Sequence, residues 1–132
     1  MEFKNIKCHP GDMIRVKLGA IYHYGIFVSE EEVIQFGLPP TLRELDKDHI
    51  AVIATDLKTF SNGNKVEVGV DNNSVYSKQE IIARARNRLG EEGYNILHNN
   101  CEHFAYECCT GKHYSSQEEI LQKMAKEKLG KK

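Results

Sequence analysis

Short runs of apolar residues, separated by turn-forming residues, occupy the first half of the chain. Such runs, rich in β-branched and aromatic side chains, are typical of β-strands. Polar turn residues such as those from Ser61 to Asn64 separate two of them. Five strands are expected, at Met13–Val16, Tyr22–Val28, Val33–Phe36, Ile50–Ala54 and Val66–Val70. The pattern predicts a small antiparallel sheet.

The second half of the chain has helical periodicity instead. Ser77 and Glu80 form a capping box that begins a helix, and Gly90 is expected to end it. The apolar residues expected on its inner face are Ile81, Ile82, Ala85 and Leu89. A strand-like link from Tyr94 to Leu97 follows. With strands first and helices later, the expected fold class is α+β, a small antiparallel sheet packed with helices.

A last helix is expected over about residues 116–129, because Ser116-Gln117-Glu118-Glu119 reads as a second capping box. Ile120, Leu121 and Met124 recur at helical spacing and are expected to dock on the rest of the protein. The lysines of this helix alternate with acids, which favours a solvated face over a lipid-binding patch.

Cys101 is the most informative residue, because it lies at the start of a short predicted helix. Asn99 or Asn100 would cap this helix, and Gly111 would end it. Cys101, Phe104, Ala105 and Cys108 share its inward stripe. Free backbone N–H groups and the helix dipole at this end favour the thiolate. Cys101 is therefore a candidate nucleophile, whereas His103 lies about 200° round the helix and is expected to be structural.

Composition narrows the class of protein. At 132 residues the chain fits one domain, residues 1–132, and its 18 basic and 19 acidic side chains exclude a general nucleic-acid binder. The N-terminal residues lack the apolar core of a signal peptide and no window is apolar enough to span a bilayer, so a cytoplasmic protein without a transmembrane anchor is expected. The oligomeric state stays open.

The four cysteines, Cys8, Cys101, Cys108 and Cys109, lack the spacing of a disulfide framework and are expected to be free thiols. The cysteines and histidines between Cys101 and His113 are residue types that bind zinc, but they include no C-x-x-C pair, so no metal is expected. No cofactor is expected either.

A thiol nucleophile needs a base, and His23 is the best candidate. If Ser29 to Glu31 form a three-residue hairpin loop, Phe27 pairs with Val33 and Gly25 with Gln35. Gln35 then lies diagonally beside His23 on the same face of the sheet, where its amide can orient the imidazole. Gly25 would leave space beside the ring.

These residues resemble a known family. Gly11-Asp12-Met13-Ile14, the strand with His23, and Asn100-Cys101-Glu102-His103-Phe104 are similar to the LRAT-like family of lecithin:retinol acyltransferase and the small phospholipase/acyltransferases. The resemblance covers about residues 8–111. It implies a circularly permuted papain-like (NlpC-like) fold with Cys101 as nucleophile and His23 as its partner. Members mostly have a second histidine where this chain has Gln35.

The resemblance implies thiol-dependent acyl transfer or acyl hydrolysis, phospholipase-like, on a lipid-type acyl ester or an acyl-bearing small molecule. Membrane contact would be peripheral. Cys101 would form a thioester, and its backbone N–H would help to bind the oxyanion. Two alternatives stay open: a cysteine peptidase or amidase acting on a peptide or cell-wall fragment, and a non-catalytic binding or regulatory domain on the same scaffold.

Overall fold

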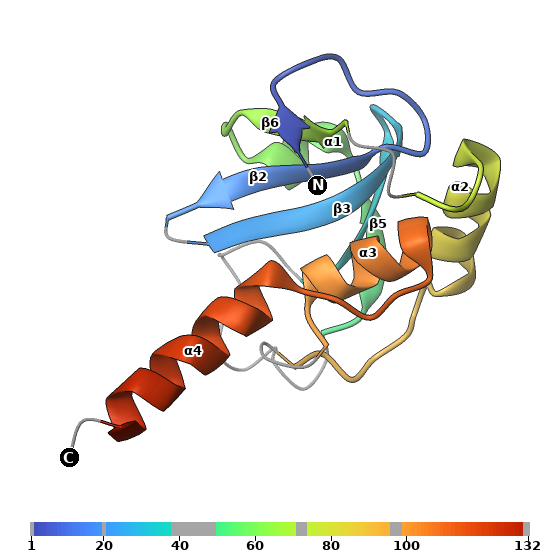
Figure 1. Cartoon of the computed structure of the whole chain (residues 1–132). Coiled ribbons are helices and arrows are strands. Elements are labelled where there is room, and N and C mark those ends of the chain that lie inside the picture. Colours follow the sequence, from blue (N-terminus) through green and yellow to red (C-terminus); the bar gives the residue numbers. More distant parts are fainter. Residues whose placement is uncertain (1, 20, 38–49, 71–73, 96–98, 131–132) are drawn as a thin grey trace.

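A computed structural model of the chain describes residues 2–19, 21–37, 50–70, 74–95 and 99–130. Within these residues six strands form one antiparallel sheet in the order β1-β6-β2-β3-β4-β5 (Figure 1). The strands are β1 (Phe3–Lys4), β2 (Met13–Leu18), β3 (Ile21–Ser29), β4 (Glu32–Phe36), β5 (Val52–Thr55) and β6 (Val66–Gly69). The predicted α+β class is confirmed.

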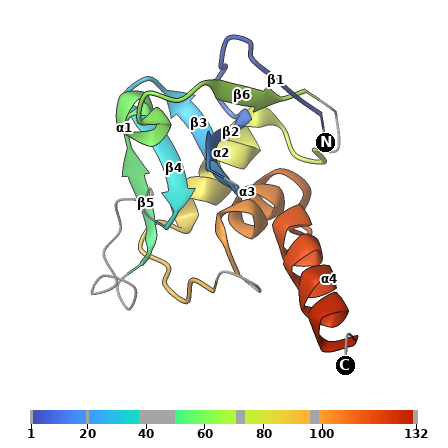
Figure 2. The same ribbon diagram turned by 90° about the vertical axis from the view of Figure 1, so that its left-hand side faces the viewer.

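Four helices accompany the sheet in the described part of the chain: α1 (Leu57–Ser61), α2 (Lys78–Asn87), α3 (Cys101–Thr110) and α4 (Ser116–Gly130). Helices α2 and α3 cover one face, while the short α1 lies on the opposite side of the sheet (Figure 2). Helix α4 extends away from the sheet in both views. The sheet therefore has two different apolar faces.

Alternation along β3 divides its residues between these two faces. Tyr24 and Ile26 point to the larger cluster, which they share with Cys101, Phe104 and other residues of α2 and α3. Phe27 points to the smaller cluster, which Phe60 of α1 completes. Because every second residue shares a face, His23 and Gly25 belong to the Phe60 side.

The predicted register of β3 and β4 is confirmed. Gly25 pairs with Gln35 and Phe27 with Val33. The turn is tighter than expected, because β3 continues to Ser29, which pairs with Glu32 after an irregularity in the ladder. The pairing of β3 with β4 is unaffected by the tighter turn, because the register of two strands depends on which side chains each strand buries.

Two elements were not predicted. The strand β1 is two residues long, and α1 has five residues, with Asp56 accepting a hydrogen bond from the Thr59 amide. Both are too short for a periodic pattern to emerge. Helix α1 nevertheless contributes Phe60, which is fully buried.

Several helix boundaries and burial predictions need correction. The capping box of Ser77 and Glu80 is present, but α2 ends with Arg88 as its C-cap instead of reaching Gly90. Leu89 is 43% exposed and Ile82 is half-buried, whereas Ile81 and Ala85 are buried as predicted. In the predicted link after Tyr94, Asn95 forms a bridge with Asn99, and the rest of the predicted strand falls in residues 96–98, outside the described residues.

Helix α4 also differs from expectation. Its first turn is capped by Ser115, whose hydroxyl accepts the Glu118 amide, and not by Ser116. Ile120 and Met124 are 58% and 59% exposed, so the prediction that these two residues dock on the domain is wrong. The side chain of Leu121, predicted to dock with them, lies outside the described part of the structure. The apolar spacing of a helix shows which side chains share a stripe, but not whether another element covers that stripe.

Candidate active site

The N-terminus of α3 is closed by Asn100, as predicted. Its side-chain oxygen accepts the amides of Glu102 at 2.9 Å and His103 at 3.1 Å, and Gly111 ends the helix in the left-handed conformation. His103 completes the box, since its Nδ1 accepts the Asn100 amide at 3.0 Å. Among the described residues, the Asn100 side chain takes the amides of Glu102 and His103 and not that of Cys101, the first helical residue.

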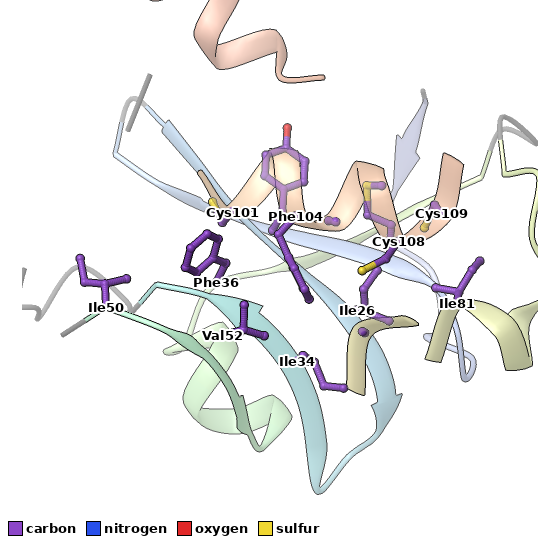
Figure 3. Packing of buried hydrophobic residues seen from close by; sticks show 14 residues of the cluster. Ile26, Ile34, Phe36, Ile50, Val52, Ile81, Cys101, Phe104, Cys108 and Cys109 are labelled. Carbon is purple, nitrogen blue, oxygen red and sulfur yellow. The ribbon is translucent and has the colours of Figure 1, made fainter. Parts of the chain in front are cut away.

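The Cys101 side chain is buried at the end of α3 where the helix meets β3. Its Sγ contacts the Tyr22 carbonyl oxygen at 3.9 Å, and the Tyr24 amide hydrogen-bonds to the sulfur. Figure 3 shows Cys101 near Phe36, while Cys108 and Cys109 lie at the other end of the helix. The inward stripe predicted for these cysteines is confirmed.

The Cys101 sulfur lies along the edge of β3 that faces β4, beyond the point where the pairing of β3 with β4 stops. The backbone groups of successive strand residues point alternately to the two edges of the strand. Phe27 exchanges backbone hydrogen bonds with the segment that leads into β2, so Tyr22 and Tyr24 direct their N–H and C=O groups to the opposite edge, toward β4. The ladder with β4 ends at Gly25 and Gln35. Cys101 therefore occupies the position along Tyr22–Tyr24 where a β4 residue would otherwise pair.

His23 lies between those two tyrosines and is buried. Its Nε2 is 2.6 Å from Oε1 of Gln35, as the predicted register implies, and its ring lies 5.1 Å from that of Phe60. Because the amide oxygen faces Nε2, this nitrogen donates and Nδ1 of the neutral ring keeps its lone pair. Among the described residues, the bond to Gln35 is the one hydrogen bond of the imidazole.

The space beside His23 is not empty. A Cβ added at Gly25 would lie 2.8 Å from a ring carbon of Phe60, so the absence of a side chain admits this phenyl ring. The ring packs against the imidazole on the α1 side. Gly25 thus permits the packing that fixes His23 from one side, while Gln35 fixes it by hydrogen bonding.

Both titratable groups are electrically neutral at neutral pH. Burial raises the pKa of the Cys101 thiol to about 11, against the lowering effect of the amides of Tyr24, Glu102 and Cys101 itself. Burial also lowers the pKa of His23, although the bond to Gln35 opposes it. The backbone amides at the helix N-terminus favour the thiolate as expected, but desolvation outweighs them, so the expected thiolate is not the stable form of Cys101.

Two further residues of the motif hold α4 in place. The buried carboxylate of Glu102 accepts hydrogen bonds from Ser115 Oγ at 2.9 Å, Ser116 Oγ at 2.8 Å and the Gln117 amide at 3.2 Å. His103 Nε2 lies 3.2 Å from a Glu118 oxygen. A carboxylate at a helix N-terminus is stabilising, so Glu102 and His103 have a structural part, as expected for His103.

Sequence reasoning missed Glu102 and Gln117. A carboxylate adjacent to Cys101 looks like a solvated charge in the sequence, and Gln117 looks like an ordinary capping-box residue. Their contacts arise because α4 begins close to the start of α3.

Among the described residues, no group of three or more His, Cys, Asp or Glu side chains could hold a metal ion, and the four cysteines are free thiols. No described helix is long and apolar enough to cross a membrane.

Comparison with known proteins adds independent evidence. A family model described as lecithin retinol acyltransferase matches residues 6–114. The human protein named lecithin retinol acyltransferase is 29% identical over 133 residues, covering 83% of this chain and 57% of that protein. Mouse phospholipase A and acyltransferase 1 is 28% identical over 107 residues, covering 73% of this chain and 64% of that protein. The chain thus spans less than two thirds of these relatives.

Proposed function

The chain belongs to the lecithin retinol acyltransferase family, and from this premise we propose that it is a cysteine-dependent acyltransferase or acyl hydrolase acting on lipid-type acyl esters. Cys101 is the nucleophile, His23 the base and acid, and Gln35 the residue that orients His23. The main support for pairing Cys101 with His23 is the position of the Cys101 sulfur, which lies against the backbone of Tyr22 and Tyr24, the two sequence neighbours of His23.

The pKa directions favour proton transfer within a neutral pair over a preformed ion pair. A thiol whose pKa is about 11 is protonated at neutral pH, and an imidazole whose pKa is lowered is ready to accept a proton. The side chains of Cys101 and His23 approach β3 from its two different faces, so in the proposed step they meet at the free edge of the strand, where the sulfur lies against the backbone of Tyr22 and Tyr24. There the hydrogen of Cys101 is transferred to Nδ1 of His23 as the sulfur attacks the acyl carbonyl carbon. Gln35 holds Nε2–H and therefore selects the tautomer in which Nδ1 is the base.

Acyl transfer then follows in two balanced steps. The carbonyl double bond opens to an oxyanion, and its collapse expels the leaving alkoxide, which takes the proton from His23 and leaves a thioester on Cys101. In the second step water, an alcohol or an amine gives a proton to His23 and attacks the thioester. This releases the free acid or the transferred acyl product and restores the thiol.

A lipid-type substrate is supported by the surface next to Cys101. Gln117, Ile120 and Met124 lie at i, i+3 and i+7 and share one stripe of α4. The Gln117 end of this stripe binds the Tyr22 amide at 2.9 Å, while Ile120, Met124 and the neighbouring Ile21 are half or more exposed. An exposed apolar stripe that leads to the nucleophile suits the acyl chains of an amphiphile.

The proposal is tested by the mass of the protein after incubation with an activated acyl ester and with phosphatidylcholine in mixed micelles. We expect one added acyl group on the wild-type chain and none on Cys101→Ala. Cys8→Ser, which alters the half-buried thiol outside the site, serves as the matched control and should be labelled like the wild type. Labelling that persists in Cys101→Ala would overturn the proposal.

A second candidate function is a non-catalytic binding domain, which the raised thiol pKa and the amide at position 35 favour. It predicts no acyl adduct on any variant. A peptide amide cleaved in preference to the lipid ester would instead identify an amidase. Parallel assays on both substrate types separate the three functions.

A further inference from the structure

We infer that Gln117 of α4 supplies the second hydrogen-bond donor of the oxyanion hole, through Nε2 of its side-chain amide, beside the backbone N–H of Cys101. The inference rests on the proposed function, since an oxyanion forms only if Cys101 attacks an acyl carbonyl. It assigns a part in catalysis to a helix outside the α3 and β3 elements that carry the Cys-His pair.

The backbone of Gln117 is fixed at the N-terminus of α3. Its amide donates to Oε1 of Glu102 at 3.2 Å, and Glu102 follows Cys101 directly in the helix. The preceding residues are held to the same carboxylate by the hydroxyls of Ser115 and Ser116. Asn100, the cap of α3, also donates to Ser115 Oγ at 3.2 Å. The start of α4 therefore lies over the helix end that carries the Cys101 amide.

The side chain of Gln117 reaches the same edge of β3 as the sulfur. Its Oε1 accepts the Tyr22 amide at 2.9 Å, and the carbonyl of that same residue contacts Sγ of Cys101 at 3.9 Å. The N–H and C=O of one strand residue point in the same direction. The carboxamide of Gln117 and the sulfur of Cys101 are thus neighbours along one backbone unit.

The orientation of the carboxamide leaves its donor available. Because Oε1 is engaged by the Tyr22 amide, the group cannot turn over without losing that bond, and Nε2 makes no hydrogen bond with any described residue. A fixed amide with a free N–H beside a nucleophile is a preorganised donor for negative charge. With the Cys101 amide it provides two donors from two separate helices.

The experiment compares acylation with alkylation of the same thiol. Acylation by an activated ester passes through an oxyanion, whereas alkylation by iodoacetamide does not. Gln117→Glu keeps an oxygen acceptor for the Tyr22 amide but removes the donor, and Gln117→Met removes both. Gln122→Glu places the same charge change on an exposed position of α4 and is the matched control.

We expect acylation of both Gln117 variants to slow by about 100- to 1000-fold at equal thiolate fraction, as loss of one oxyanion donor does. Alkylation at equal thiolate fraction should stay at the wild-type rate, and Gln122→Glu should match the wild type in both reactions. Wild-type acylation rates in both Gln117 variants, or equal losses in acylation and alkylation, would overturn the inference. A wild-type chain that is alkylated but never acylated would refute the proposed function itself.

Discussion

Oε1 of Gln35 lies 2.6 Å from Nε2 of His23, inside the sheet and between two neighbouring strands. Both side chains are buried, so neither group can exchange this bond for water. A neutral amide orients the imidazole without adding charge, and the pKa of His23 is lowered by burial. A buried carboxylate at this position would act in the opposite direction.

Replacement of Gln35 by glutamate should therefore shift the pH dependence of acylation. A carboxylate beside Nε2 favours the imidazolium, so the pKa of His23 rises and the acid limb of the pH–rate profile moves to higher pH. Gln35→Leu should move the limb to lower pH and reduce the maximal rate, because burial then acts unopposed and the ring is no longer oriented. An unmoved acid limb in Gln35→Glu would contradict the assignment of His23 as base.

The buried Cys101 thiol should make the protein less stable in alkali. Its pKa is about 11 in the folded state against 9.0 for the free side chain. Between these values the unfolded chain has lost the proton that the folded chain retains, so the free energy of unfolding falls as pH rises. The thiol accounts for a loss of roughly 2–3 kcal/mol at 1.36 kcal/mol per pKa unit.

Urea unfolding of the wild type and Cys101→Ala at a series of pH values measures this loss. We expect the stability of the wild type relative to Cys101→Ala to fall by this amount as the pH rises from 9 to 11, because the variant lacks this group. Cys108 and Cys109, whose pKa values are also raised by burial, are present in both proteins and cancel in the difference. Parallel curves would show that the Cys101 thiol is not desolvated in solution.

Gly25→Ala should destabilise the protein through Phe60. The added methyl group would lie 2.8 Å from a Phe60 ring carbon and 3.1 Å from the Ile34 carbonyl oxygen. Overpacking of this kind costs about 1–3 kcal/mol. Urea unfolding gives the loss, and Phe60→Leu in the same chain should recover part of it. A double-mutant cycle without coupling between the two positions would contradict the contact.

Glu102→Gln should loosen the first turn of α4. The carboxylate accepts two serine hydroxyls and the Gln117 amide, and hydrogen bonds to a charged group contribute about 1.5–3 kcal/mol. Hydrogen exchange should speed up at the amides of Gln117 and Tyr22, because Gln117 joins the two segments. Ser61→Ala, on the far side of the sheet, is the control; unchanged exchange in Glu102→Gln would show that the carboxylate does not hold α4.

Local signals in the sequence were sufficient for part of the site. Asn100 and Gly111 mark the two ends of α3 because capping depends on residues within one turn of the helix end. The pairing of Gly25 with Gln35 was also predictable, because a hairpin joins neighbouring strands and alternation fixes which side chains each strand buries. These local features alone predict that Gln35 lies beside His23.

The exposed stripe of α4 shows the limit of such reasoning. Ile120 and Met124 have the spacing of a docked helix, yet α4 is held through its first turn by Glu102 and continues away from the sheet (Figure 1). The thiol pKa shows the same limit, since the helix N-terminus favours the thiolate but the depth of burial decides the balance. Neither the exposure of the α4 stripe nor the pKa of the Cys101 thiol can be predicted from a short stretch of sequence.

The sequence by itself determined the cap that begins α3 and the strand register that joins His23 to Gln35, and it singled out the side chains of the candidate site, because each of these depends on near neighbours along the chain. Tertiary structure alone decided that Cys101 fills the edge of β3 beyond the end of β4, that Phe60 fills the space at Gly25, and that Gln117 arrives beside the sulfur. These contacts join segments that are distant in sequence, and they depend on how the elements pack.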